Sequence, residues 1–280
     1  MKNILVVITT AFVPTGGLTT VMMNYYRMMN KEEVKIDFAS TNNPPQVLLD
    51  EIHASGSEYC QLPDRKNVLA YFFALKKLCR GYDGMHVHAN SAMAVMELQA
   101  AIWAGIKIRI IHNHSSRSQH NLLNQLFLSL YRRSFTQAVA CSDEAGEWLY
   151  GKNGFITLRN AINAKRFKFD VVKRLIMRHN FGFGDDEYVI GHIGKFMEAK
   201  NHPFLIEVFT KYHALQPKSK LLLIGDGELR HLVEAAIDKN KVNDCVILAG
   251  LRSDIPDVLQ AIDIFLFPSI YEGMPLSVVE

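Results

Sequence analysis

Apolar runs of strand length alternate with helical patterns along this sequence, and this alternation constrains the fold more than any other feature. In the first half we expect strands at residues 2–9, 35–39, 84–88, 107–112, 137–141 and 157–159. We expect helices between them at residues 19–29, 46–54, 68–79 and 91–104. The strands are too apolar to alternate cleanly, which is typical of parallel strands covered on both faces. The pattern predicts an α/β fold with a parallel sheet.

The same pattern restarts after a basic helix expected at residues 170–180. Strands are expected at residues 188–192, 220–224, 245–248 and 262–267, with helices at 202–214 and 228–240 and a short turn at 255–260. Two α/β units in series predict two Rossmann-like domains, residues 1–165 and 186–280, joined by a connector at residues 166–185. Clefts between domains are preferred ligand sites, so we expect the two domains to face one.

Length and composition agree with a two-domain globular protein. The chain has 280 residues, of which 49% are apolar and 21% charged, enough for two cores. No apolar run approaches the roughly 18 residues of a membrane-spanning helix. The start shows no signal-peptide pattern, and the four cysteines show no paired spacing, so we expect a cytoplasmic protein with reduced thiols. Residues 275–280 begin a helix that stops after about one turn, so we expect the second domain to be C-terminally incomplete.

Charge is distributed unevenly, although the net charge is only +3. Residues 98–142 contain five bases and no acid, whereas residues 221–280 contain ten acids and four bases. The first half should therefore attract phosphates or an anionic membrane surface, unless this is simply a solvated charged face. Residues 118–134 form an apolar helical stripe that ends in Arg132 and Arg133. This helix either packs on the core or meets a membrane or a lipid-linked acceptor.

Glycines follow several expected strands. Gly16 and Gly17 follow the first strand, and Gly194, Gly225 and Gly227 follow strands of the second half. Glycines at strand ends let the backbone approach a phosphate, although ordinary tight turns have the same composition. Because the first turn lacks the GxGxxG fingerprint, we do not expect a dehydrogenase.

Two lysines lie close to one of these glycine turns. Lys195 follows a strand end and Lys200 precedes a helix, so both ammonium groups are candidates to bind one anion. The alternative is a pair of ordinary surface lysines.

A glycine turn between two carboxylates, Glu272 and Glu280, ends the chain. A carboxylate accepts two hydrogen bonds from a sugar diol, so Glu280 is a candidate for a ribose and Glu272 for a transferred sugar. Free amides at a helix start are candidates for a diphosphate. They belong to Gly273, Met274, Leu276 and Ser277, since Pro275 has no donor.

His112 and His114 lie at the end of an expected strand of the first domain. A buried histidine is often structural, but two at one strand end favour a functional role. With no acid or cysteine nearby, the spacing does not suit a metal site. Hydrogen bonding to a sugar or phosphate is the interpretation that the residues favour.

The second-half motifs together resemble the retaining glycosyltransferases of family four, which have the GT-B fold. The resemblance rests on Gly194-Lys195-Phe196, Lys200-Asn201-His202, Gly225-Asp226-Gly227, Phe267-Pro268-Ser269, and Glu272 with Glu280. Further matches are Gly16-Gly17, Ser142 and Asn160-Ala161-Ile162-Asn163. The histidine stretch is most similar to the branch that builds bacterial capsular and exopolysaccharides.

The resemblance implies a reaction and assigns roles to residues. The donor would be a nucleoside-diphosphate sugar, usually UDP-linked, transferred with retained configuration and without a metal or other cofactor. Lys195 and Lys200 would neutralise the diphosphate, Glu280 would hold the ribose, and Glu272 would contact the sugar. Residues around Arg252 would line the base pocket, Gly17 would approach the donor, and His112 or His114 would match a first-domain histidine. The chain departs from the family in two ways, because the family usually has arginine at the Lys195 position and continues past Glu280.

From this resemblance we expect a cytoplasmic glycosyltransferase, peripheral at the inner membrane surface, that acts on a lipid-linked or growing glycan. We expect no nucleic-acid partner. A nucleotide-sugar epimerase on the same fold is one alternative, and donor turnover without an acceptor would favour it. The other alternative is an inactive sugar-nucleotide-binding remnant, which donor binding without transfer would favour.

Overall fold

The computed structural model describes residues 1–117 and 121–280, which form two compact units. The first unit contains Met1–Ala161 and Gly273–Pro275, and the second contains Ile162–Glu272 and Leu276–Glu280. Residues 166–185, which we expected to be a separate connector, are part of the second unit.

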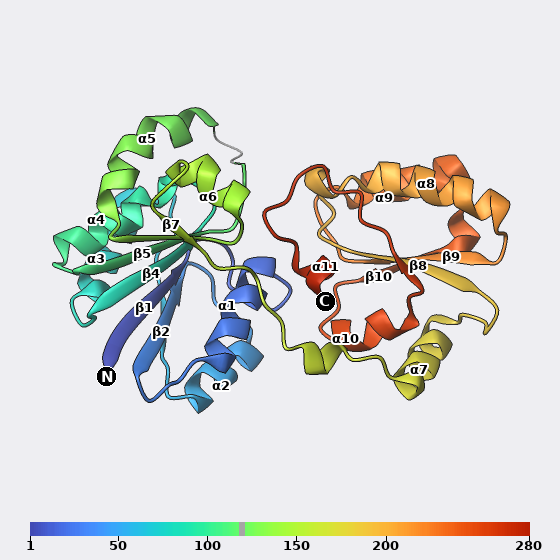
Figure 1. Ribbon diagram of the computed structural model, residues 1–280, viewed down its shortest axis with the longest axis horizontal. Helices are drawn as coiled ribbons and strands as arrows, with labels where there is room; N and C mark the ends of the chain where they lie inside the picture. Colours follow the sequence, from blue (N-terminus) through green and yellow to red (C-terminus); the bar gives the residue numbers. More distant parts are fainter. Residues whose placement is uncertain (118–120) are drawn as a thin grey trace. The chain divides into compact units, whose positions relative to one another are not determined.

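A seven-stranded parallel sheet forms the centre of the first unit (Figure 1). Its spatial order is β3-β2-β1-β4-β5-β6-β7, and every neighbouring pair is parallel. The strands are β1 (Lys2–Ile8), β2 (Val34–Ser40), β3 (Tyr59–Gln61), β4 (Gly84–Ala89), β5 (Ile108–Asn113), β6 (Gln137–Ala140) and β7 (Phe155–Thr157).

Helices cover both faces of this sheet, as the apolar strands predict (Figure 1). On one face, Val6 and Ile8 of β1 pack with α1 (Gly17–Met28) and α2 (Gln46–Ala54). On the other, Leu5 and Val7 pack with the remaining helices of the unit, because successive strand residues point to opposite faces. Those helices are α3 (Val68–Cys79), α4 (Val95–Trp103), α5 (Asn121–Ser134) and α6 (Asp143–Tyr150).

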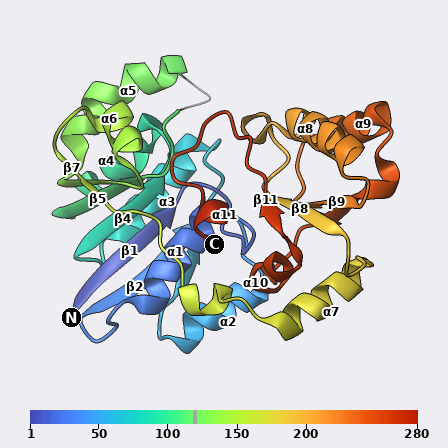
Figure 2. The same cartoon turned by 45° about the vertical axis from the view of Figure 1, so that its right-hand side comes forward.

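The second unit repeats the architecture with four parallel strands in the order β10-β9-β8-β11. Figure 2 labels three of them, β11, β8 and β9. The four strands are β8 (Tyr188–Ile193), β9 (Ser219–Ile224), β10 (Val246–Gly250) and β11 (Ile264–Phe265). Helices α8 (His202–Leu215) and α9 (Arg230–Asn240) pack on one face, and α7 (Val171–Phe181) and α10 (Ile255–Val258) on the other. A four-residue helix, α11 (Leu276–Val279), lies near the end of the chain. The α/β class and the parallel sheets predicted from the sequence are confirmed.

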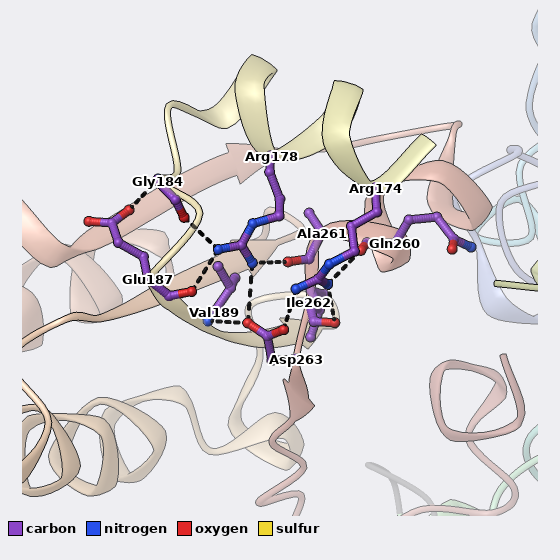
Figure 3. A network of polar contacts seen from close by, with 9 residues as sticks. All are labelled: Arg174, Arg178, Gly184, Glu187, Val189, Gln260, Ala261, Ile262 and Asp263. Atoms are coloured by element: carbon purple, nitrogen blue, oxygen red, sulfur yellow. Dashed lines mark hydrogen bonds and ion pairs between the residues drawn. The ribbon is translucent and has the colours of Figure 1, made fainter. Parts of the chain in front are cut away.

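The basic helix α7 belongs to the second unit because a polar network ties it to β8 and to the segment before β11 (Figure 3). The Arg178 side chain is 5% exposed and donates to the carbonyls of Gly184 and Glu187 at 2.7 and 2.6 Å. It also pairs with Asp263 at 3.2 Å, and Arg174 binds the other oxygen of that carboxylate. The Asp263 carboxylate accepts a third bond from the Val189 amide at 2.7 Å.

Each sheet has one place where the chain reverses its direction of strand addition. In the first unit this lies between β1 and β4, and in the second between β8 and β11. In open α/β sheets, ligands bind at the carboxyl ends of the strands at such a switch point. The fold therefore marks one candidate ligand position in each unit.

Candidate functional site

The switch point of the second unit is built from the loops that follow β8, β9 and β11. The Gly194 amide donates to the Ile224 carbonyl at 2.9 Å, and the Phe196 amide donates to the Asp226 carbonyl at 3.0 Å. The Ile270 amide in turn donates to the Ala199 carbonyl at 2.8 Å. The backbone thus holds the three loops together as one surface.

Two of the predicted donor-binding glycines are required by the contact between these loops. A Cβ on Gly225, whose φ is +141°, would lie 2.0 Å from the Gly194 carbonyl oxygen. A Cβ on Gly227 would lie 2.4 Å from the Phe196 carbonyl oxygen. A larger residue would separate the loops, so these glycines have a packing role. Their contact with a donor stays a prediction.

Lys200 and Glu272 meet at this switch point. The Lys200 Nζ lies 2.7 Å from the Glu272 Oε1, and their side chains are 15% and 24% exposed. The same ammonium group lies 5.1 Å from the centre of the Phe267 ring. Asn201 follows Lys200 in a left-handed conformation, with φ at 54°, and turns the chain into α8. A fixed, half-buried cation beside a carboxylate therefore lies where the fold predicts a ligand.

Lys195 has a different environment. Its Nζ lies 2.8 Å from Glu228 Oε1, and the two side chains are 60% and 68% exposed. Such a solvated pair contributes little to stability, so the lysine is free to exchange its partner for another anion. The structure brings Lys200 and Glu272 together, whereas the convergence of Lys195 on the same anion stays a prediction.

Two buried histidines lie at this point, His192, which the sequence analysis did not single out, and His202, which it quoted only as part of a motif. The Nδ1 atom of His192 lies 2.8 Å from the Leu266 carbonyl oxygen, and its ring meets that of His202 edge-on at 5.0 Å. Burial, with a smaller effect from the neighbouring Lys200 charge, lowers the pKa of His192 to about 4 and that of His202 to about 3. The position of His192 on a buried strand was the signal that could have found it.

The pKa values of these two histidines predict a loss of stability in acid. Both rings stay neutral in the folded unit, whereas the unfolded chain takes up protons below its ordinary histidine pKa of about 6.5. Stability is therefore complete above pH 6.5 and falls as the pH drops from there towards 4. Between pH 7 and pH 5 we expect each ring to remove on the order of 2 kcal/mol. Urea unfolding at both pH values, compared with His202→Gln, measures this loss; an unchanged pH dependence in the variant contradicts it.

Arg252, predicted to line a base pocket, lies just after the edge strand β10. Its guanidinium pairs with Asp254 through Nε at 2.8 Å and lies 5.8 Å from the Phe181 ring centre. The pairing raises the pKa of Arg252 and lowers that of Asp254. The residue is therefore held by neighbours of its own unit, and its contact with a base stays a prediction.

The glycine turn after Glu272 is shared between the units. Gly273, Met274 and Pro275 group with the first unit, where Asn160 Nδ2 donates to the Met274 carbonyl at 2.6 Å. Leu276 and Ser277 begin α11, and the Glu280 amide donates to the Leu276 carbonyl at 2.9 Å. The binding of a diphosphate by the predicted amides, and of a ribose by Glu280, stays a prediction.

The switch point of the first unit contains the predicted Gly16-Gly17 turn. Gly16 caps α1, and no described atom would lie within 4 Å of a Cβ on Gly17. Gly17 is therefore not required by packing, which leaves open space at the helix start. On the neighbouring strand β4, the His88 carbonyl accepts a bond from the Thr9 amide at 3.2 Å.

His112 and His114, predicted to bind sugar or phosphate, join two further histidines from β4. His112 lies within β5, and its ring stacks at 5.6 Å on that of His86. His114 follows β5, and its Nε2 lies 2.9 Å from His88 Nδ1. Burial lowers the pKa of all four rings. The His-x-His spacing at residues 86–88 was the signal for the missed pair, because alternate strand residues share one face.

Comparison with known proteins gives a match to one family. Residues 173–280 match the family described as Glycosyl transferases group 1. The match covers most of the second unit, including Lys195, Lys200 and Glu272.

Three relatives match almost the whole chain. "Putative glycosyltransferase EpsF" of Bacillus subtilis (strain 168) is 28% identical, over 95% of this chain and 73% of its own length. An Escherichia coli protein, "UDP-Gal:alpha-D-GlcNAc-diphosphoundecaprenol alpha-1,3-galactosyltransferase", is 25% identical over the same shares of the two chains. A third relative, "Capsular polysaccharide biosynthesis glycosyltransferase CapH" of Staphylococcus aureus, is 22% identical over 95% of this chain and 75% of its own length.

Among solved structures, Anabaena Alr3699/HepE in complex with UDP and glucose has the same fold. The TM-score is 0.81 at 16% sequence identity, over 96% of this chain and 74% of that chain. WaaG, a glycosyltransferase involved in lipopolysaccharide biosynthesis, superposes with a TM-score of 0.71 at 14% identity, over 95% of this chain and 75% of that chain.

Proposed function

We propose that this chain, whose residues 173–280 match the glycosyl transferases group 1 family and which has the GT-B fold, moves a sugar from a UDP-linked donor to a lipid-linked or growing polysaccharide. Both EpsF and CapH are named as glycosyltransferases, CapH one of capsular polysaccharide biosynthesis, and the proposal assigns this chain to capsule or exopolysaccharide synthesis. The observation that carries the proposal is the ion pair of Lys200 and Glu272 at the switch point between β8 and β11.

The charges of this pair match the changes that glycosyl transfer produces. Breaking the bond between the anomeric carbon and the donor phosphate leaves negative charge on the diphosphate and positive charge on the sugar. Lys200 stabilises the first charge, because a fixed cation in a half-buried position needs little reorganisation when the bond breaks. The Glu272 carboxylate, which has several acceptor positions, can accept hydrogen bonds from the sugar hydroxyls while Lys200 binds the diphosphate.

The other residues of the donor site take the roles that the family resemblance implies. Lys195 exchanges Glu228 for the diphosphate, Glu280 binds the ribose and Arg252 lines the base pocket. The amides of Gly273, Met274, Leu276 and Ser277 donate to the diphosphate. In the first unit, Gly17 approaches the donor, and one of His112 and His114 contacts the transferred sugar.

We propose that transfer retains the anomeric configuration and that no metal ion bridges the diphosphate. The acceptor hydroxyl attacks from the face that the phosphate leaves, and a phosphate oxygen takes its proton. Two lysines then supply the charge that Mg²⁺ supplies in other phosphate sites.

The proposal is tested by donor binding followed by transfer. Thermal shift with UDP and a panel of UDP-sugars identifies the donor, because a ligand that binds only the folded state raises the melting temperature. Transfer is then measured to a polyprenyl-diphosphate-linked sugar, with NMR of the new anomeric centre, in EDTA and in Mg²⁺. We expect one product with the donor's configuration and equal rates in both buffers.

Other outcomes contradict the proposal in distinguishable ways. Interconversion of the donor sugar without an acceptor would indicate an epimerase. Donor binding without transfer to any acceptor would indicate a binding protein. A transfer rate that requires Mg²⁺ would contradict the proposal that lysines neutralise the diphosphate without a metal ion.

The surface of α5 supports an acceptor at a membrane. Leu122, Leu126 and Leu130 are spaced four residues apart and are 84%, 72% and 49% exposed, so this side of the helix does not face the core. Arg132 and Arg133 lie in its last turn. An apolar stripe with bases beside it binds anionic lipid surfaces. Among the described helices, none has the length and apolar character needed to cross a membrane.

Replacing Leu122 and Leu126 with aspartate is expected to reduce binding to vesicles that contain phosphatidylglycerol by at least about tenfold, because each change removes exposed apolar area and adds repulsion. Sedimentation with vesicles measures the bound fraction. Leu215→Asp is the matched control, since Leu215 is 78% exposed on α8 of the second unit. Equal vesicle binding by the double variant and the control would contradict the proposal that α5 binds the membrane.

A further inference from the structure

Four histidine rings form one cluster on the face of the first sheet that α1 and α2 cover. His86 and His88 alternate with Met85 and Val87 on β4, and the latter two pack in the opposite core. In the parallel register, His88 is paired with His112 of β5. The ring centres of His86 and His88 lie 4.3 Å apart, and those of His88 and His112 lie 5.1 Å apart.

Four ring nitrogens of this cluster are buried without a hydrogen-bond partner in the described part of the chain. They are both ring nitrogens of His112, together with His86 Nε2 and His114 Nδ1. The neighbours of His86 and His88 in the β1 register are Val6 and Ile8, which offer no polar group. Buried polar groups are normally satisfied, and each exception calls for a ligand, an ion or water.

The chemistry of the cluster selects the kind of ligand. One ring nitrogen from each of His86, His88 and His112 lies within 4.8 Å of the other two. Neutral imidazoles bind zinc, copper, nickel and cobalt ions, whereas Mg²⁺ and Ca²⁺ prefer oxygen ligands. We propose that His86, His88 and His112 bind one divalent transition-metal ion of the zinc type.

The cluster needs only a small adjustment to hold such an ion. Bonds of about 2.0–2.1 Å in a tetrahedral site place ligand nitrogens about 3.3 Å apart. The present separations are within 4.8 Å, and the soft Cβ–Cγ torsions are the ones that would adjust to reach that spacing. His114 serves as the orienting partner, because its Nε2 lies 2.9 Å from His88 Nδ1 and leaves the other nitrogen of His88 to bind the ion.

The ion ties β4 to β5 beside the switch point of the first unit. It is distinct from any metal at the donor diphosphate, since its ligands are imidazoles of another unit, and the inference does not rest on the proposed function. Either His112 or His114 was considered for contact with the transferred sugar. If His112 binds the metal ion, His114 is the one left for that contact. The sequence alone offered His112 and His114, and the strand register supplies the other two ligands.

The whole chain, dialysed against a chelator and then against buffer, is titrated with Co²⁺ and with Zn²⁺. We expect one equivalent to bind, Co²⁺ to give the visible absorption of a tetrahedral nitrogen site, and Zn²⁺ to raise the melting temperature. His86→Gln and His112→Gln are expected to weaken binding at least about 100-fold, and His114→Ala by about 10–100-fold through lost orientation. His231→Gln, at an exposed histidine of α9, is the control and should bind as the parent does.

No uptake by the parent chain, or equal uptake by His86→Gln and His112→Gln, overturns the assignment. X-ray absorption of the zinc-loaded parent chain decides the matter if a variant does not fold. A zinc ion bound by three imidazole nitrogens at about 2.0–2.1 Å supports the site, and coordination by oxygen alone refutes it.

Discussion

Lys200→Ala is expected to lower kcat/KM for sugar transfer by about 10²–10³-fold, the usual effect of removing one fixed group that stabilises charge in a transition state. The Lys200 ammonium is 15% exposed and is held between Glu272 and the Phe267 ring. The ammonium group is in position before the donor binds. Its removal therefore takes away stabilisation of the negative charge that develops on the diphosphate. Steady-state kinetics with the donor identified by thermal shift measures the effect.

Controls separate this role from a loss of folding. Lys200→Arg keeps the positive charge and should retain more activity than Lys200→Ala, while losing the compact ammonium geometry. Lys218→Ala removes another lysine–carboxylate pair of the second unit, but that pair is 72% and 66% exposed, so activity should not change. If Lys200→Ala keeps the kcat/KM of the Lys218→Ala protein while folded, then Lys200 is not part of the donor site.

A variant of Lys195 tests whether one lysine or two lysines bind the donor diphosphate. If its ammonium group exchanges Glu228 for the diphosphate, Lys195→Ala weakens donor binding, although less than Lys200→Ala because the exposed group is screened by solvent. The order of the two effects follows from burial, since both lysines have the same charge.

The sequence was sufficient for the fold because the pattern of apolar runs is a local property. Strand and helix positions such as 84–88 and 46–54 agree with β4 and α2 to within a residue. The exceptions have physical reasons. The three-residue strand β3 is too short to show a period, and the expected strand at 262–267 is reduced to Ile264–Phe265, the part that pairs with β8. The helix α6 was missed although Ser142 caps it by accepting a bond from the Ala145 amide.

The candidate site was only partly visible in the sequence. Lys200 and Glu272 were candidates in the sequence, but their separation of 72 positions gives no local signal that they pair. His86 and His88 were missed because their proximity to His112 depends on which strands are neighbours. Likewise, Gly225 and Gly227 were predicted to let a ligand approach, and their packing role against the Gly194 and Phe196 backbones was not visible in the sequence. Tertiary pairing, which a single sequence does not encode locally, accounts for each difference.

Asp263→Ala is expected to destabilise the second unit by about 3–5 kcal/mol, because it leaves a buried cation without its partner. Arg178 is 5% exposed, and Asp263 also binds Arg174 and the Val189 amide, so one substitution breaks the link between α7, β8 and the segment before β11 (Figure 3). Hydrogen exchange of the amides in β8 reports the loss as reduced protection. Both tryptophans, Trp103 and Trp148, lie in the first unit, so tryptophan fluorescence shows whether that unit is unaffected.

The matched control for Asp263 is Asp257→Ala, which removes another carboxylate that pairs with α7. Lys173 and Asp257 are 48% and 40% exposed, so this pair should contribute less than about 1 kcal/mol. Asp263→Asn keeps an oxygen acceptor for Val189 and should fall between the two. Equal protection of β8 in Asp263→Ala and Asp257→Ala would mean that packing of Met177 and Val258 against the sheet, and not the buried charge pair, holds α7 in the second unit.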